Sequence, residues 1–339
     1  MKRRYELDLC RITACVMVML IHTSAEIYRY CPMFSSSFTE INFIATLARG
    51  SVPVFFMLSG TLLFSREELP LAPFLKNHAL KLAGLFFFWS VFYAAGSRVA
   101  AGSFALDYDF FMAVARGHYH LWFLPAMVVC YLFMPLVFCA IHGKKIDSRY
   151  LLALFFGFVI LWRNLNLTPK PAYILHQFTL DFSLDWLPYL GYAIWGWWLG
   201  ERKMPKHTML TSSAVFVVCT LLAARGNLWY SRLNNEAEGW LFHYMSLPSF
   251  IQATCIFCFF NALRGHEFKH TALIRTLSDC TLGVYLIHPL MIDLLDRVHI
   301  GMTADYPALS VTGFTALLAL LCFAVTFIAR KIPIVKKLL

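Results

Sequence analysis

Two basic side chains in the first apolar segment share one face of the helix that this segment predicts. Arg11 and His22 are eleven residues apart, which at 100° per residue is three turns plus about 20°, with about 16 Å of rise. An imidazole titrates near neutral pH and can accept a proton, whereas a guanidinium keeps its charge. Asp8 lies one turn before Arg11 and can pair with it. The alternative is that Arg11 snorkels to the surface and His22 is an interfacial histidine.

A third basic side chain, Arg49, begins the next apolar stretch, Arg49-Gly-Ser-Val-Pro-Val-Phe-Phe-Met-Leu-Ser-Gly60. This stretch enters the membrane from the outer side, so we expect Arg49 to lie at a depth comparable with that of His22, where the two can meet. An Arg that faces lipid is costly, so its side chain should point into the protein. Pro53, Ser59 and the flanking glycines permit a close helix approach or a local break. The alternative is a packing motif with an interfacial Arg.

A membrane must surround these side chains. Of 339 residues, 59% are hydrophobic, 17% aromatic and 14% charged, and the mean hydropathy is +0.63, whereas soluble domains carry about 25% charged residues. This composition excludes a soluble globule and a large extramembrane domain. The apolar runs predict an all-α, polytopic integral membrane protein of about ten transmembrane helices. These spans are expected near 8–26, 42–64, 79–97, 119–141, 150–163, 186–199, 208–224, 244–263, 273–296 and 308–329.

The charge distribution orients these spans. Ten spans place both termini on one side, and assigning that side to the cytoplasm puts nineteen Lys and Arg residues there and eight opposite, with Arg11 and Arg49 inside spans. The asymmetry predicts cytoplasmic termini. The net charge of +10 then forms a cytoplasmic collar and does not indicate a nucleic-acid partner. Spans 150–163 and 186–199 are short and can be tilted, broken or re-entrant.

Ten cysteines fall almost entirely within or beside the predicted spans, and Cys31 alone lies in an outward loop. Such thiols are expected to pack in the apolar interior, with no metal site. The chain has no internal repeat, low-complexity tract or Gly/Ser linker. A single transmembrane domain over residues 1–339 is therefore the simplest organisation.

An ordered set of motifs makes the sequence similar to a known family. Asp8-x-x-Arg11, the Arg-x10-His pair ending at His22, Val54-Phe-Phe-Met-Leu-Ser-Gly60, His120-Leu-Trp-Phe-Leu-Pro125 and the segment Leu277–Pro289 follow one another along most of the chain. Together they resemble the membrane acyltransferase 3 family. Because no hydrolase-like segment is appended, the sequence most resembles the short, single-domain surface-glycan O-acetyltransferases of that family, such as that of enterobacterial common antigen.

This resemblance implies a membrane O-acyltransferase of the bacterial cytoplasmic (inner) membrane. It implies transfer of an acyl group, usually acetyl, from cytoplasmic acyl-CoA to a hydroxyl of a surface polysaccharide or its lipid-linked precursor. Acetyl-CoA is then a donor substrate, and no cofactor is bound permanently. The family's essential histidine maps to His22, a general base, and its arginine to Arg11, which we expect to orient the acyl-CoA. Our own inference is that Arg49 stabilises developing oxyanion charge.

The third predicted span departs from the family pattern. Family members usually carry Arg-x-x-Arg there, and this chain has Lys76, His78 and Lys81 in the matching segment. Positive charge for the phosphates of coenzyme A is retained, but the bidentate geometry of arginine is lost. The alternative is an ordinary positive-inside cluster.

Aromatic and histidine side chains are candidates for contacts with the acceptor. His120 and Trp122 lie at the outer entrance of the fourth span, and Tyr285 and His288 lie in the ninth, where His288 can face His22 from another helix. Such rings can stack on sugars, although interfacial aromatic belts are the commoner cause of this pattern. A transporter or flippase of lipid-linked sugars, or a sensor derived from the same fold, remains the rival function. A homo-oligomer is also compatible with the sequence.

Overall fold

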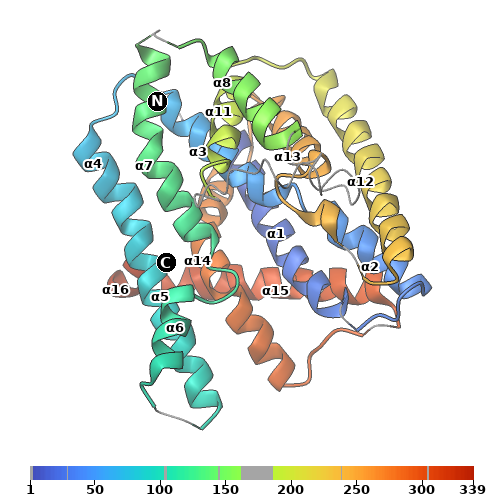
Figure 1. Cartoon of the computed structure of the whole chain (residues 1–339). Helices are drawn as coiled ribbons and strands as arrows, with labels where there is room; N and C mark the ends of the chain where they lie inside the picture. Colours follow the sequence, from blue (N-terminus) through green and yellow to red (C-terminus); the bar gives the residue numbers. More distant parts are fainter. Residues whose placement is uncertain are drawn as a thin grey trace.

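The computed structural model describes residues 3–28, 30–102, 105–143, 146–161, 186–237, 239–303 and 305–339, and these are helical apart from turns and loops (Figure 1). The elements, in chain order, are α1 (Tyr5–Tyr28), α2 (Ser36–Leu47), α3 (Ser51–Phe64), α4 (Leu71–Leu75), η1 (Lys76–Leu80), α5 (Lys81–Ala100), α6 (Tyr108–Arg116), α7 (Phe123–His142), α8 (Ser148–Leu154), η2 (Phe155–Leu161), α11 (Tyr189–Gly200), α12 (His207–Asn234), η4 (Trp240–Phe242), α13 (Leu247–Asn261), α14 (Thr271–Arg297), α15 (Pro307–Ala329) and α16 (Pro333–Leu338).

The polytopic membrane architecture is confirmed. Within the described residues, eight helical segments are long and apolar enough to cross a membrane. The predicted fifth and sixth spans correspond to shorter apolar segments, Ser148–Leu161 and the 12-residue α11. Twelve residues rise about 18 Å, which is well short of a hydrocarbon core of about 30 Å. These are the two segments that the sequence marked as short, and positions 162–163 of the predicted fifth span lie outside the described residues.

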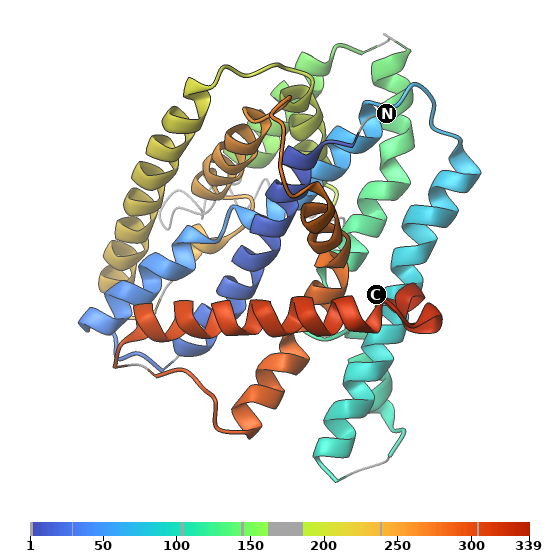
Figure 2. The same ribbon diagram turned by 180° about the vertical axis from the view of Figure 1, so that it is seen from behind.

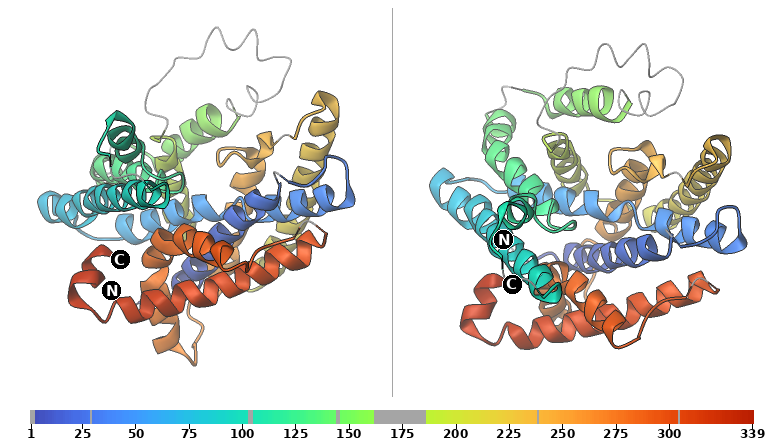
Figure 3. Two further views of the ribbon diagram at one scale, coloured as in Figure 1. Left: turned by 90° about the horizontal axis from the view of Figure 1, so that it is seen from below. Right: turned by 60° about the horizontal axis from the view of Figure 1, so that its bottom comes forward.

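Helices α1 and α3 occupy the centre of the molecule. They pack against each other, with α14 and α15 against α1 and with α11 and α13 against α3 (Figure 3). Seen from behind, α15 runs across α1 (Figure 2). The polar stripe of the first helix therefore lies inside the protein, where its charges and imidazoles can be satisfied by neighbouring helices.

The short helix α11 is buried because glycines let it touch α3 directly. A Cβ atom added at Gly60 would lie 1.9 Å from the backbone oxygen of Ala193, and one at Gly196 would lie 2.3 Å from that of Met57. Each clash is with backbone, which a side-chain movement cannot relieve. Small residues allow such approaches between membrane helices, and this one fixes the position of α3.

The predicted span 42–64 is two helices. Helix α2 ends at Leu47 and α3 begins at Ser51, so the local break permitted by the sequence is present. Pro53 lies in the first turn of α3, where the missing N–H of a proline costs no helical bond. Arg49 lies in this break.

Candidate functional site

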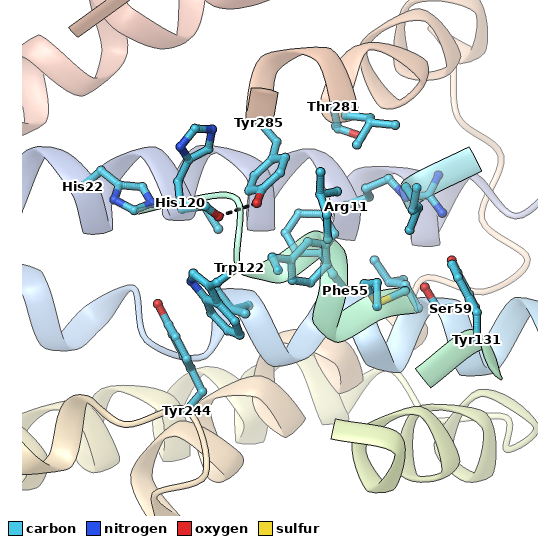
Figure 4. A pocket seen from close by; sticks show the side chains of 18 residues that line it. Arg11, His22, Phe55, Ser59, His120, Trp122, Tyr131, Tyr244, Thr281 and Tyr285 are labelled. Carbon is cyan, nitrogen blue, oxygen red and sulfur yellow. Dashed lines mark hydrogen bonds between the residues drawn. The ribbon is translucent and has the colours of Figure 1, made fainter. Parts of the chain in front are cut away.

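A cavity of about 220 Å³ lies between α1, α3, α7 and α14 (Figure 4). Both Arg11 and His22 line it, as their spacing predicts. Its other polar lining includes Ser59, His120, Tyr131 and Tyr285. Figure 4 shows Arg11 and His22 at opposite ends, with aromatic side chains between them. One cavity thus joins a cationic end to a histidine end.

The cationic end is a connected network of ion pairs and hydrogen bonds. Arg11 Nη1 donates to Ser278 Oγ (3.2 Å), which donates to Asp8 Oδ1 (2.6 Å). Arg3 Nε donates to Asp8 Oδ2 (2.6 Å), and Arg3 Nη2 donates to Asp279 Oδ1 (2.8 Å). The hydrogen bond with Asp8 raises the pKa of Arg3. Because Asp8 is only 7% exposed while Arg11 is 27% exposed, the network holds Arg11 in place and leaves it accessible.

Imidazoles gather at the other end. The His22 ring lies 4.9 Å from the His288 ring and 5.2 Å from the Tyr119 ring, centroid to centroid. The His288 ring lies 5.3 Å from that of His120, and Nδ1 of His120 lies 2.9 Å from Nδ1 of His118, so that one donates and the other accepts. In the part of the chain that the structure describes, no group of three or more His, Cys, Asp or Glu side chains is placed to hold a metal ion.

The loop before α7 presents His118 and His120 as neutral rings. Burial lowers the pKa of both side chains below the usual value for histidine. His118 stacks on Tyr93 with a centroid distance of 4.3 Å, and the hydroxyl of Tyr285 donates to the backbone oxygen of His120. His120 is 1% exposed, and its Nε2 atom has no hydrogen-bond partner among the described residues. This ring therefore offers an unused polar atom at the cavity.

Arg49 lies behind the histidine end. Its Nε donates to the Ala45 oxygen (3.1 Å), its guanidinium lies 4.1 Å from the ring centroid of Phe242, and its charge interacts with the Tyr244 side chain. Tyr244 itself lines the cavity and stacks on Trp122 at 5.4 Å. Arg49 therefore reaches the cavity through Tyr244, a residue that the sequence analysis did not identify.

The structure separates the three residues of the predicted donor-binding segment. His78 packs between Phe74 (4.9 Å) and Tyr131 (5.2 Å), measured between ring centroids, and Tyr131 lines the cavity together with Ser59. Lys76 and Lys81 are exposed. His78 thus belongs to the packing around the cationic end, and the two lysines face outward.

The family model described as "Acyltransferase domain" matches residues 4–330. The chain belongs to the acyltransferase 3 family. An amino-acid racemase of Enterococcus faecalis is 24% identical over 309 residues, which are 86% of this chain and 41% of that relative. The chain thus spans about two-fifths of the length of this curated relative. No solved structure matches significantly.

For an acyltransferase, the cavity supplies two kinds of group that the reaction needs. A fixed cation can hold an anionic donor, and an imidazole can accept a hydroxyl proton. The sequence analysis gave roles to Arg11, His22 and Asp8 but none to Ser278 and Tyr131, which complete the cationic end from α14 and α7. Serines and tyrosines are common in membrane helices, so their positions relative to Arg11 are visible only after the helices pack.

Proposed function

We propose that this membrane acyltransferase moves an acyl group, most simply acetyl, from cytoplasmic acyl-CoA to a hydroxyl of a surface glycan or its lipid-linked precursor. The observation that carries the proposal is the single cavity with Arg11 at one end and His22 at the other. Membership of the acyltransferase 3 family supports acyl transfer, and we extend it to a glycan acceptor and a bacterial cytoplasmic membrane because the sequence motifs resemble those of short O-acetyltransferases such as that of enterobacterial common antigen.

In the proposed reaction, His22 takes the proton of the acceptor hydroxyl as its oxygen attacks the thioester carbonyl. A new C–O bond forms, the C–S bond breaks, and the proton passes to the departing thiolate to give free coenzyme A. Imidazole suits this exchange because it gains and loses a proton near neutral pH. The pair Arg49 and Tyr244 lies at the same end and supplies donors for the developing oxyanion.

Arg11 orients the donor in this proposal. It is the member of the network that lines the cavity, and its partners Asp8 and Ser278 hold it in place, so an anion that enters the cavity meets this cation. Lys76 and Lys81, exposed beside His78, attract the phosphates of coenzyme A. Trp122 and Tyr244, stacked on each other, offer aromatic faces to an acceptor sugar.

The experiment compares wild type with His22→Asn after reconstitution into vesicles. Labelled acetyl-CoA is supplied with the lipid-linked glycan fraction of bacterial membranes, and label in the glycan and free coenzyme A are both measured. We expect the variant to lose transfer by about 10²–10⁴-fold, the usual contribution of a general base. His142→Asn is the matched control, since His142 bonds the Phe64 oxygen outside the cavity.

Two results would count against the proposal. Glycan acylation at the wild-type rate in His22→Asn would remove the base from the mechanism. Movement of lipid-linked sugar across the vesicle without release of coenzyme A would favour a transporter. The racemase relative does not bear on this choice, because the chain matches less than half of that protein.

A further inference from the structure

A proline in α14 decides how its neighbour His288 is held. Pro289 lies inside this helix, and proline has no N–H to donate to the carbonyl four residues earlier. That carbonyl belongs to Tyr285. The structure shows its replacement donor: Nδ1 of His288 lies 2.7 Å from the Tyr285 oxygen. A carbonyl can only accept, so Nδ1 of His288 carries the hydrogen.

This hydrogen bond fixes the tautomer of the ring. A neutral imidazole carries one N–H, so a hydrogen on Nδ1 leaves Nε2 as a bare acceptor. His288 is 0% exposed, and its Nε2 has no partner among the described residues. Leaving a buried polar atom unsatisfied costs about 1–3 kcal/mol. The helix therefore holds a buried lone pair that no donor among the described residues meets.

The donor within reach is the imidazole of His22. The rings of His288 and His22 lie 4.9 Å apart and are tilted by 36°. The nitrogens lie on the rims of the rings, so a rotation of the His22 side chain can bring its N–H to hydrogen-bond distance, about 3 Å. His120, whose ring centroid lies 5.3 Å from that of His288, is anchored by the hydrogen bond between its Nδ1 and Nδ1 of His118, so its ring cannot turn toward His288 without breaking that bond.

We propose that His288 is a positioning residue whose Nε2 accepts the N–H of His22, so that the opposite nitrogen of His22 faces the acceptor hydroxyl. The inference rests on the proposed role of His22 as the base. When His22 takes the hydroxyl proton, the hydrogen bond to His288 strengthens because its donor has become charged. His288 thus acts as the third member of a nucleophile, base and orienter series.

A neutral orienter suits this environment. An aspartate at this buried position would carry a permanent negative charge. No cation among the described residues forms an ion pair with His288, so the carboxylate would be buried without a partner, which is costly. An imidazole held in one tautomer offers the same acceptor without a charge in the resting state. Pro289 contributes to this arrangement, because it leaves the Tyr285 carbonyl free to accept from Nδ1 of His288 and so to fix the tautomer of that ring.

Two substitutions separate the two nitrogens of His288. In His288→Asn the amide nitrogen takes the place of Nδ1 and can still donate to the Tyr285 carbonyl, but the acceptor at the ε position is lost. In His288→Gln the amide oxygen can reach the ε position. With labelled acetyl-CoA and the lipid-linked glycan fraction as substrates, we expect His288→Asn to lower kcat by at least tenfold with an unchanged KM for acetyl-CoA. We expect His288→Gln to recover at least a third of the wild-type kcat.

A second measurement reads the tautomer of the wild-type ring directly and uses a variant only for assignment. In wild-type protein with ¹⁵N-labelled histidine in lipid nanodiscs, the His288 resonances, assigned by their loss in His288→Asn or His288→Gln, should show hydrogen on Nδ1 and none on Nε2. Hydrogen on Nε2 would overturn the proposal whatever the activity of the variants. A wild-type kcat in His288→Asn, or equal loss in both variants, would also overturn it. These results leave the His22→Asn experiment unaffected, so failure of this inference is distinguishable from failure of the proposed function.

Discussion

The two ends of the cavity treat their polar atoms in opposite ways. At the cationic end, Arg11 and Asp8 are joined through Ser278, and Arg3 closes the network from outside. At the histidine end, the Nε2 atoms of two buried rings, His120 and His288, have no partner among the described residues. The first end is complete before a substrate arrives, and the second is not.

This difference separates positioning from chemistry. An ion network whose charges are all paired fixes the geometry of its side chains, because removing one partner leaves another charge buried and unpaired. A buried ring nitrogen without a hydrogen bond lowers the stability of the fold. Such an atom is expected where a substrate or a proton supplies the missing partner. We therefore expect substitutions at the cationic end to act first on stability and donor affinity, and those at the histidine end to act first on turnover.

The largest expected effect is at the centre of the cationic end. Asp8→Ala leaves Arg3 and Arg11 without their shared carboxylate, and breaking a buried pair in this way costs about 3–5 kcal/mol. We expect thermal unfolding of the purified protein in detergent to shift strongly downward.

Asp279→Ala is the matched control, because Asp279 also accepts from Arg3 but is 37% exposed. An exposed ion pair contributes about 0–1 kcal/mol, so this variant should unfold close to wild type. Equal destabilisation by the two alanines would contradict the view that the buried carboxylate organises the cationic end.

At the histidine end, Tyr285→Phe removes the hydroxyl that donates to the His120 backbone. The net contribution of one such hydrogen bond is about 1 kcal/mol, so the loss of stability should be modest. We expect kcat to fall several-fold because His120 is released beside His288, whereas the KM for acetyl-CoA should not change. Tyr150→Phe, an exposed tyrosine on α8, controls for loss of a hydroxyl. A variant with normal kcat and a raised donor KM would reverse the assignment of the two ends.

Within one helix, the sequence carried most of the information about this site. The eleven-residue spacing placed Arg11 and His22 on one face because helical geometry is regular, and both line the cavity. The break beside Arg49 was also suggested by Pro53 and its neighbouring glycines. The long apolar helices were predicted for the same reason: length and composition are properties of each segment alone.

Contacts between helices were harder to predict. That His288 reaches His22 depends on how α14 packs against α1, and that Arg49 meets Tyr244 depends on the loop after α12. Neither distance follows from periodicity. The short helix α11 is likewise held by the backbone contact at Gly60, a tertiary feature for which the pattern of small residues was only a hint.

The smallest expected effect is on the outward face of the donor side. Lys81 is exposed, and we expect Lys81→Ala to raise the KM for acetyl-CoA by about two- to fivefold at low salt, with kcat unchanged. Added salt should remove most of the difference, because exposed charges are screened beyond about 10 Å at 0.1 M. Lys336→Ala in α16 removes another lysine of the predicted cytoplasmic collar and should leave the KM as in wild type. If Lys81→Ala also has the wild-type KM at low salt, its charge serves orientation in the membrane, and the proposed contact with the donor rests on Arg11.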